Sequence, residues 1–239
     1  MKQFLFSVLT VLVIFAGLQA CVYVESEDNI PPRGESTRTF DLKNFDKLVM
    51  GSAYRVNVKA GPAFGVSATG ELNDLDDLNV FVQDRKLVVR YENSWKNRRT
   101  MQIDITMPDL ESVDFSGAVM SKIEGFENLP EVEFELSGAS KCDFNGSAQE
   151  LKFDLSGASR LNLFGSGKYL DGEVSGASQL HAFDMPVEES DLDVSGASKA
   201  RVSVSRLLVV DANGASEVRY LGAPAVDKKV SGGSTVRQE

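Results

Sequence analysis

Residues 153–161 read Phe-Asp-Leu-Ser-Gly-Ala-Ser-Arg-Leu, and near copies of this segment recur throughout the second half of the 239-residue chain. The central Ser-Gly-Ala-Ser motif, intact or with one substitution, begins at Ser116, Ser137, Ser156, Ser175, Ser195, Asn213 and Ser231. Successive copies lie 18 to 21 residues apart. A near-constant interval of this length is typical of repeat proteins, in which each repeat packs on its neighbours.

Apolar and polar residues alternate on both sides of each motif, which is the pattern of a strand with one buried face. When the copies are aligned on the motif, each aligned position forms a column of equivalent residues. The column two positions before the motif is polar and mostly acidic: Asp114, Glu135, Asp154, Glu173, Asp193 and Asp211. The neighbouring apolar columns predict a set of inward-pointing side chains: Phe134, Leu136, Phe153, Leu155, Val174, Val194, Cys142, Leu161 and Leu180.

The repeat is too short for a strand–helix–strand unit, because two strands and a corner leave no room for a crossover helix. Leucine-rich repeats have a similar period but require a different leucine pattern. The inward columns are buried if each strand pairs in parallel with its counterpart one coil further on. The sequence therefore predicts an all-β fold, a β-solenoid of roughly 19-residue coils with Ser-Gly-Ala-Ser corners.

Small residues at the corners have a physical reason, since equivalent atoms of stacked coils lie only about 4.8 Å apart. Glycine also adopts the positive φ that a tight corner requires. Replacing Gly157 or Gly176 by Val should therefore cost well over about 1 kcal/mol. We expect Gly232 and Gly233, in the last coil, to tolerate the change better.

The repeats and the stretch from Phe45 to Lys59, FDKLVMGSAYRVNVK, resemble the head GIN domain family, the putative auto-transporter adhesins. The resemblance covers about residues 38–239, of which residues 110–239 form the regular coils. It implies a right-handed parallel β-helix and an exported, often lipid-anchored protein of the bacterial envelope. It supplies no catalytic residue.

The segment between the tether and the regular coils is less periodic but reads as short strands at residues 48–50, 54–59, 64–69, 78–82, 87–91 and 101–107. We expect incomplete coils there that also cap one end of the solenoid, because an open end exposes unpaired strand edges. At the other end, Lys228 and Lys229 interrupt the pattern, as in a protected edge.

The first twenty residues predict an export signal, because Lys2 precedes an apolar run too short to span a membrane. The run ends in Leu-Gln-Ala-Cys21, which resembles the lipobox of bacterial lipoproteins, although Gln19 departs from it. We expect Cys21 to carry a lipid that anchors the chain to the membrane, with residues 21–37 as a polar tether. Plain secretion, with Cys21 an incidental thiol, is the alternative. The resemblance favours the outer membrane of a Gram-negative bacterium, facing the periplasm or the surface.

Charge and composition exclude several function classes. The chain has 25 Lys and Arg against 35 Asp and Glu, a net charge of −10, so nucleic acid is not an expected partner. One histidine and two cysteines cannot build a multi-histidine or four-cysteine metal centre, and no cofactor is expected. His181 falls in an outward column without catalytic partners, and Cys142 falls in an inward column as an inert thiol.

Two other places carry candidate binding residues. The acidic column is either a solvated face or, at Asp171, Glu173, Asp191 and Asp193, a site for a hard cation. Trp95, with Arg98 and Arg99 nearby, either stacks on a sugar or docks a partner, or else packs onto the sheet at the tip of a hairpin.

Two functions follow from these patterns. The first is a non-enzymatic envelope protein, an adhesin or scaffold, whose acidic solenoid surface binds an envelope protein or a glycan. The alternative is a polysaccharide lyase or hydrolase, since parallel β-helices also host those activities. A glycosidase needs two carboxylates at a defined separation, one with a raised pKa, and the regular column distinguishes no such pair.

Overall fold

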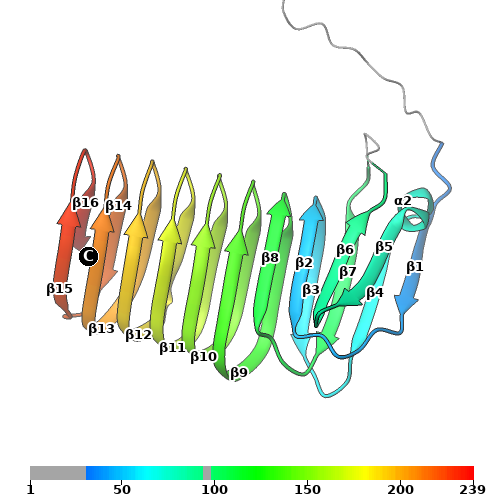
Figure 1. The fold of residues 1–239 in the computed structure, drawn as a ribbon, viewed down its shortest axis with the longest axis horizontal. Helices are drawn as coiled ribbons and strands as arrows, with labels where there is room; N and C mark the ends of the chain where they lie inside the picture. The colour runs from blue at the N-terminus through cyan, green and yellow to red at the C-terminus, as the bar shows by residue number, and fades with distance from the viewer. Residues whose placement is uncertain (1–30, 94–97) are drawn as a thin grey trace, which may run out of the picture. The chain divides into compact units, whose positions relative to one another are not determined.

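The computed structural model describes residues 31–93 and 98–239, and their fold is almost entirely β (Figure 1). One short helix, α2 (Leu72–Asp76), lies among strands β1 (Glu35–Phe40), β2 (Lys47–Ser52), β3 (Tyr54–Ala60), β4 (Gly65–Glu71), β5 (Leu78–Gln83), β6 (Lys86–Tyr91) and β7 (Met101–Met107). The later strands are β8 (Ser112–Gly117), β9 (Met120–Leu136), β10 (Lys141–Leu155), β11 (Arg160–Val174), β12 (Gln179–Val194), β13 (Lys199–Ala212), β14 (Glu217–Leu221), β15 (Ala225–Val230) and β16 (Thr235–Gln238).

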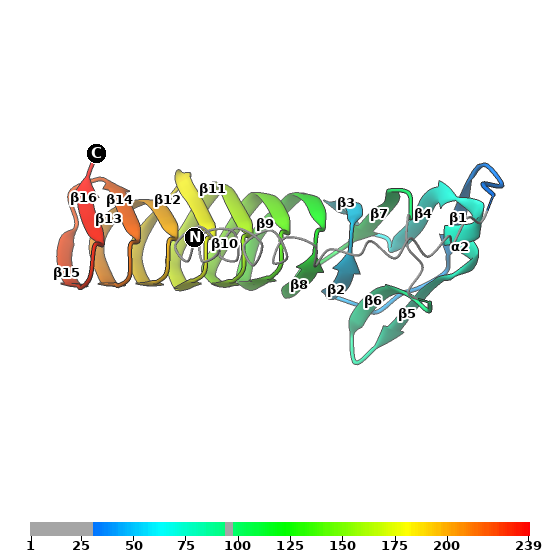
Figure 2. The same cartoon turned by 90° about the horizontal axis from the view of Figure 1, so that it is seen from above.

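From β8 onward every strand pairing is parallel, so the predicted β-solenoid is confirmed. The register places equivalent repeat positions side by side, for example Leu136 with Leu155 and Leu155 with Val174. Each coil runs up one face, turns at a narrow Ser-Gly-Ala-Ser corner, descends the other face and returns through a wider bend (Figures 1 and 2). We call residues before a corner the pre-corner face, residues after it the post-corner face, and the wide return the bend edge.

The corners stack backbone on backbone, as the small residues predicted. The Ala158 N–H donates to the Gly138 carbonyl at 2.7 Å, and the Ala177 N–H donates to the Gly157 carbonyl at 2.8 Å. Gly157 and Gly176 both have φ +72°, in the region that favours glycine. Gly232 has φ +67° and a Cβ there would lie 2.5 Å from the Gly214 carbonyl oxygen, so its place in the last coil gives it no more room than Gly157 has. The expectation of better tolerance stands for Gly233, where a Cβ would meet its nearest atom at 3.7 Å.

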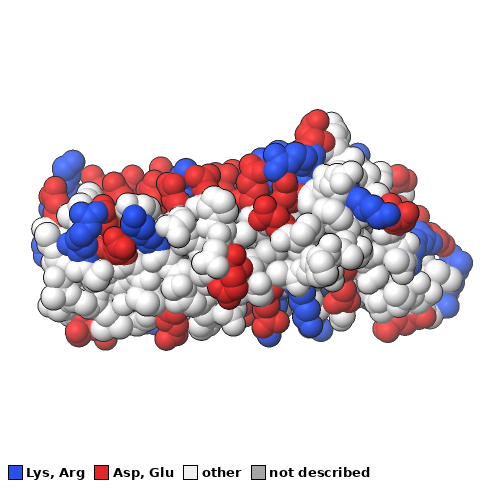
Figure 3. All heavy atoms as spheres, turned by 90° about the horizontal axis from the view of Figure 1, so that it is seen from below, with Lys and Arg blue, Asp and Glu red and all other residues white. Residues whose placement is uncertain are grey.

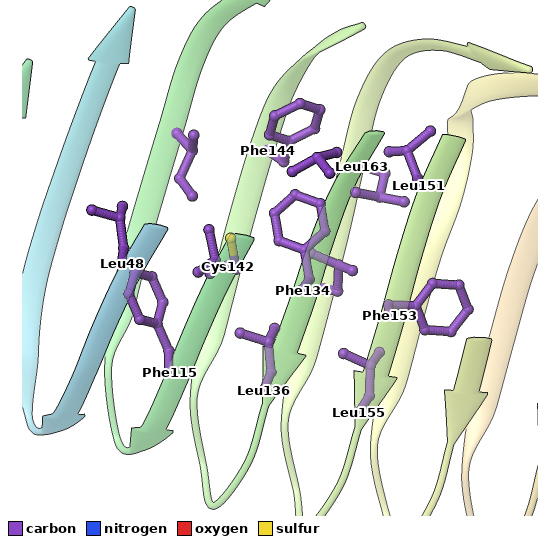
Figure 4. Packing of buried hydrophobic residues seen from close by; sticks show 14 of the residues in the cluster. Leu48, Phe115, Phe134, Leu136, Cys142, Phe144, Leu151, Phe153, Leu155 and Leu163 are labelled. Atoms are coloured by element: carbon purple, nitrogen blue, oxygen red, sulfur yellow. The ribbon is translucent and has the colours of Figure 1, made fainter. Parts of the chain in front are cut away.

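The core fills the space between the two faces (Figure 4). All nine side chains predicted to point inward are buried, with exposed fractions of 4% or less. Phe134 packs edge-on against Phe144, with ring centroids 5.2 Å apart. The last serine is also buried in five of the motifs, at Ser140, Ser159, Ser178, Ser198 and Ser216, and Ser159 Oγ donates to Ser178 Oγ at 3.3 Å between adjacent coils. Burial of these repeated columns is the main stabilising contribution of the fold.

The N-terminal strands form coils, but not in chain order. β2 lies between β6 and β8, and β3 lies between β7 and β9, with all four pairings parallel. The segment β2–β3 therefore inserts as a coil between β6–β7 and β8–β9. β4 pairs antiparallel with β7, β1 with β4, and β5 with β6. These antiparallel strands cap the solenoid, as expected, although neither the coil order nor α2 was anticipated.

The last coil, β15 and β16, pairs on one side only. Val230, whose equivalents in earlier coils are buried, is 45% exposed. Lys228 occupies a column that is apolar in most other coils, and its Nζ donates to the Val236 carbonyl at 3.4 Å across the coil. An inward-directed lysine on an edge strand discourages pairing with another chain.

Candidate functional site

The acidic column of the sequence forms one row on the pre-corner face. The register pairs Asp114 with Glu135, Glu135 with Asp154, Asp154 with Glu173, Glu173 with Asp193 and Asp193 with Asp211. We call these six residues the acidic ladder. All six side chains reach solvent, with neighbours about one strand spacing, 4.8 Å, apart. Figure 3 shows acidic residues along one long margin of the molecule when the bend edge faces the viewer.

Two carboxyls on the pre-corner face have raised pKa values. Partial burial, followed by the charges of Asp114, Glu133 and Asp154, raises the pKa of Glu135. Burial and then the charges of Asp171 and Asp193 raise the pKa of Asp191. The predicted cation ligands are adjacent, since Asp171 pairs with Asp191 and Glu173 with Asp193. Within residues 31–93 and 98–239, however, no group of three or more His, Cys, Asp or Glu side chains is placed to hold a metal ion.

The post-corner face carries the opposite charge around His181. Register places His181 between Asn162 and Arg201, and the adjacent column holds Arg160 and Lys199. Burial lowers the pKa of His181, and the charges of Arg201, Arg160 and Lys141 lower it further. Its column neighbours are an amide and a guanidinium, which do not form a general base and its orienting carboxylate.

Cys142 is an interior residue, as its column predicted. It is fully buried, and burial raises the pKa of its thiol to about 12. A thiol with that pKa is protonated at neutral pH and is a poor nucleophile.

The regular parallel pairing of the coils is interrupted at the bend edge between β11 and β12. Pairing of these strands stops after Asn162 with His181 and resumes at Tyr169 with Glu189. Two adjoining hollows of about 200 and 340 Å³ open here, and they share Gly167 and Glu188. The first is also lined by Asn128, Ser147, Ala148, Gln149, Ser166 and Lys168. The second is also lined by Pro186, Val187, Ser203, Val204, Ser205, Gly222 and Ala223. We call the two together the bend groove.

A third hollow, of about 240 Å³, lies where the pairing of β11 and β12 resumes on the pre-corner face. Its lining includes Tyr169, Leu207 and four acidic residues, Glu150, Asp171, Glu189 and Asp191. We call it the acidic hollow. Glu150 forms an ion pair with Lys152, and Glu189 forms one with Arg206. Asp171 and Asp191, by contrast, face each other across adjacent strands.

The sequence predicted a binding site at Trp95, Arg98 and Arg99, and the described residues include the two arginines. The Arg98 guanidinium lies 3.6 Å from the Tyr91 ring centroid and forms ion pairs with Asp74 and Asp77. The Asp77 carboxylate is only 2% exposed, so Arg98 neutralises a buried charge. Arg99 donates its backbone N–H to Asp74 at 3.1 Å, and its side chain is exposed. Trp95 and the lipidation candidate Cys21 lie outside the described residues.

The bend groove is the feature that the sequence interpretation missed. Two signals were present: the segment Phe-Gly-Ser-Gly-Lys at residues 164–168, and an interval of 20 residues between Ser175 and Ser195 after two intervals of 19. Small residues and an extra residue both point to a locally irregular bend. In the described part of the chain, no helix is long and apolar enough to cross a membrane.

The described residues form a capped β-solenoid, a class of repeat fold that is not tied to one reaction. The family model described as putative auto-transporter adhesin, head GIN domain, matches residues 44–224, and the chain belongs to this family.

Solved structures show the same fold. A putative adhesin from Bacteroides fragilis is 19% identical, with a TM-score of 0.76 over 87% of this chain and 99% of that one. A putative adhesin from Parabacteroides merdae is 18% identical, with a TM-score of 0.73 over 88% and 98%. A protein from Parabacteroides distasonis named as a putative lipid binding protein is 16% identical, with a TM-score of 0.67 over 88% and 99%. No curated protein matches the chain.

Proposed function

We propose that this chain is a non-enzymatic protein of the cell envelope that acts as an adhesin or scaffold. In this proposal residues 1–20 direct export, a lipid on Cys21 anchors the chain to the outer membrane, and the solenoid presents its acidic face to an envelope protein or a glycan. The family description and the putative adhesins among the structural neighbours support an exported, surface-associated role.

The observation that carries the proposal is the unbroken register of the acidic ladder. Hydrogen-bonded parallel strands hold its carboxylates at a fixed spacing of about 4.8 Å, so the row is rigid. Each neighbouring pair repels by up to about 1 kcal/mol in water. A partner that presents cations or hydrogen-bond donors at a matching spacing relieves this repulsion, which gives the surface both affinity and specificity.

Bead adhesion to isolated envelope fragments tests this proposal. We expect beads coated with the full chain to adhere, and the triple variant Glu135→Gln, Asp154→Asn and Glu173→Gln to lose most of that adhesion. A control variant, Glu35→Gln, Asp41→Asn and Asp84→Asn, removes three exposed acids outside the ladder. Both variants change the net charge from −10 to −7. Equal adhesion of the two variants would contradict a role for the ladder.

The acidic hollow favours a second candidate, a polysaccharide hydrolase or lyase. It holds a carboxyl of raised pKa, Asp191, with a second carboxyl, Asp171, beside it on the adjacent strand, and a general acid of a glycosidase is a carboxyl of raised pKa. Release of reducing ends, or of unsaturated uronates detected by ultraviolet absorbance, from a panel of polysaccharides tests it. Turnover by the native chain that Asp191→Asn abolishes would establish the enzyme and overturn the non-enzymatic proposal.

A further inference from the structure

The bend groove differs from the rest of the solenoid surface in its chemistry. Residues 163–167 stay paired in parallel with β10 on one side, but on the other side they have no strand partner in β12. Figure 3 shows that the bend edge is largely uncharged, whereas acidic residues follow its margin.

We propose that the bend groove binds a neutral oligosaccharide laid across the coils from β9 to β14. This inference rests on the proposed adhesin function and names the ligand class of one of its surfaces. One half of the groove offers the Ser166 hydroxyl and the Gln149 amide, whereas the Ser147 hydroxyl there already donates to Glu127 and accepts from the Asn128 N–H. The other half offers Pro186, Val187 and Val204 as an apolar floor.

That division matches a sugar ring, which has hydroxyls at its edge and an apolar face of C–H groups. The only charged side chains that line the groove are Lys168 and Glu188, one of each sign. A lysine and a carboxylate within one site can donate to and accept from the same hydroxylated ligand. Tyr169 adds an aromatic surface at the rim, since its ring centroid lies 5.0 Å from Lys168 Nζ and the residue is 36% exposed.

Charge and length select among glycans. Asp171, Glu189 and Asp191 lie at the next hollow along β11 and β12, so an anionic polymer would meet like charges there. The groove lining runs over six coils, from Asn128 on β9 to Gly222 after β14, a span of about 24 Å at the strand spacing. It therefore fits a neutral chain of several sugar units better than a monosaccharide or a polyuronate.

Affinity gel electrophoresis tests the assignment with defined polymers. The full chain in detergent is run through gels that contain dextran, galactomannan or xylan, and through gels that contain polygalacturonate. Ser166→Trp places a large ring in the groove, and Glu188→Ala removes one hydrogen-bonding group. Ser36→Trp is the matched control, because Ser36 is equally exposed but lies on β1. Circular dichroism melts confirm that each variant is folded.

We expect the native chain to be retarded in at least one gel that contains a neutral polysaccharide. The apparent affinity should be about tenfold weaker for Glu188→Ala. Retardation should be almost completely lost for Ser166→Trp and unchanged for Ser36→Trp. Three results would overturn the assignment: no retardation in any neutral gel, retardation unaffected by Ser166→Trp, or retardation by polygalacturonate alone. Bead adhesion that persists while all neutral gels fail would refute the groove and leave the adhesin proposal intact. Retardation in a neutral gel without bead adhesion would refute the adhesin proposal and leave the groove assignment intact.

Discussion

Substitution of a corner glycine tests whether the coils are stacked as tightly as the structure shows. At Gly157, φ is +72°, and a Cβ would lie 2.6 Å from the Gly138 carbonyl oxygen. That oxygen already accepts the Ala158 N–H at 2.7 Å, so it cannot move away without weakening a bond between coils. The left-handed conformation costs an L-residue about 1–2 kcal/mol, and more for a β-branched one.

The contact adds to that cost. An added Cβ and the carbonyl oxygen must separate by about 0.8 Å to reach the 3.4 Å of ordinary contact, and loss of the hydrogen bond between coils costs about 1 kcal/mol. Gly157→Val should therefore lower the free energy of unfolding by about 2–4 kcal/mol. For a domain of this size that corresponds to a melting temperature lower by roughly 5–15 °C.

Circular dichroism melts and urea titrations of Gly157→Val, Gly176→Val and Gly233→Val would decide the matter. Gly233 has an ordinary φ and a nearest contact of 3.7 Å, so its variant should melt within a few degrees of the native chain. Equal and small shifts for all three variants would mean that the corners are not stacked, and the reasoning from the repeat would fail.

Cys21→Ser should abolish membrane partitioning and palmitate labelling, because a lipid on that thiol is the anchor we propose; labelling that persists would refute it. Glu135→Gln should raise stability at pH 7 and have no effect near pH 3, since a carboxyl with a raised pKa loses stability as pH rises through that pKa. Arg98→Ala should cost about 3 kcal/mol at neutral pH, because Asp77 is left buried and unpaired, and the loss should shrink below pH 4 as that carboxyl protonates. Lys228→Val should produce concentration-dependent dimers in sedimentation velocity, because it removes the inward charge that protects the last edge strand.

Control variants distinguish the predicted effects of Glu135→Gln and Lys228→Val from the effects of removing any surface charge. Asp84→Asn removes an exposed acid from the β5–β6 turn, outside the ladder, and should leave stability unchanged at both pH values. Lys229→Val changes an outward-facing lysine of the same strand and should stay monomeric. A dimer formed equally by Lys229→Val, or a pH-independent gain for Glu135→Gln, would contradict the mechanism given for each.

The regular coils could be predicted residue by residue because a solenoid converts sequence period directly into spatial neighbours. A column of the aligned repeats, such as Leu136, Leu155 and Val174, becomes a row of side chains in contact. Burial of that row requires one register, since a slip by one residue would turn it to solvent. The repeat pattern in the sequence is therefore enough to predict which side chains form the core of these coils.

The N-terminal segments were predicted as strands of incomplete coils, but the order of those coils could not be predicted. Their segments lack the Ser-Gly-Ala-Ser corner, so nothing in the pattern aligns one with another. The insertion of β2–β3 between β6–β7 and β8–β9 depends on long-range packing, such as Leu48 beside both Leu87 and Val113. The ion pairs of Arg98 depend on the same long-range packing. The sequence placed this guanidinium near a loop aromatic, and the structure adds two buried carboxylates, which come from α2 and the residue after it.

The bend groove shows where such a fold can acquire specificity. Corners are held by backbone hydrogen bonds between coils, and both faces are held in register by the core, so an extra residue can be accommodated only at the bend. The repeat that begins at Ser175 is one residue longer than the repeat before it, and residues 183–185 of β12 have no partner in β13. A change in bend length therefore reshapes the groove while the corners and the acidic ladder keep their register. Of the groove residues, Val187 and Val204 also belong to the buried core, whereas Ser166, Lys168 and Glu188 do not and can vary without loss of core packing.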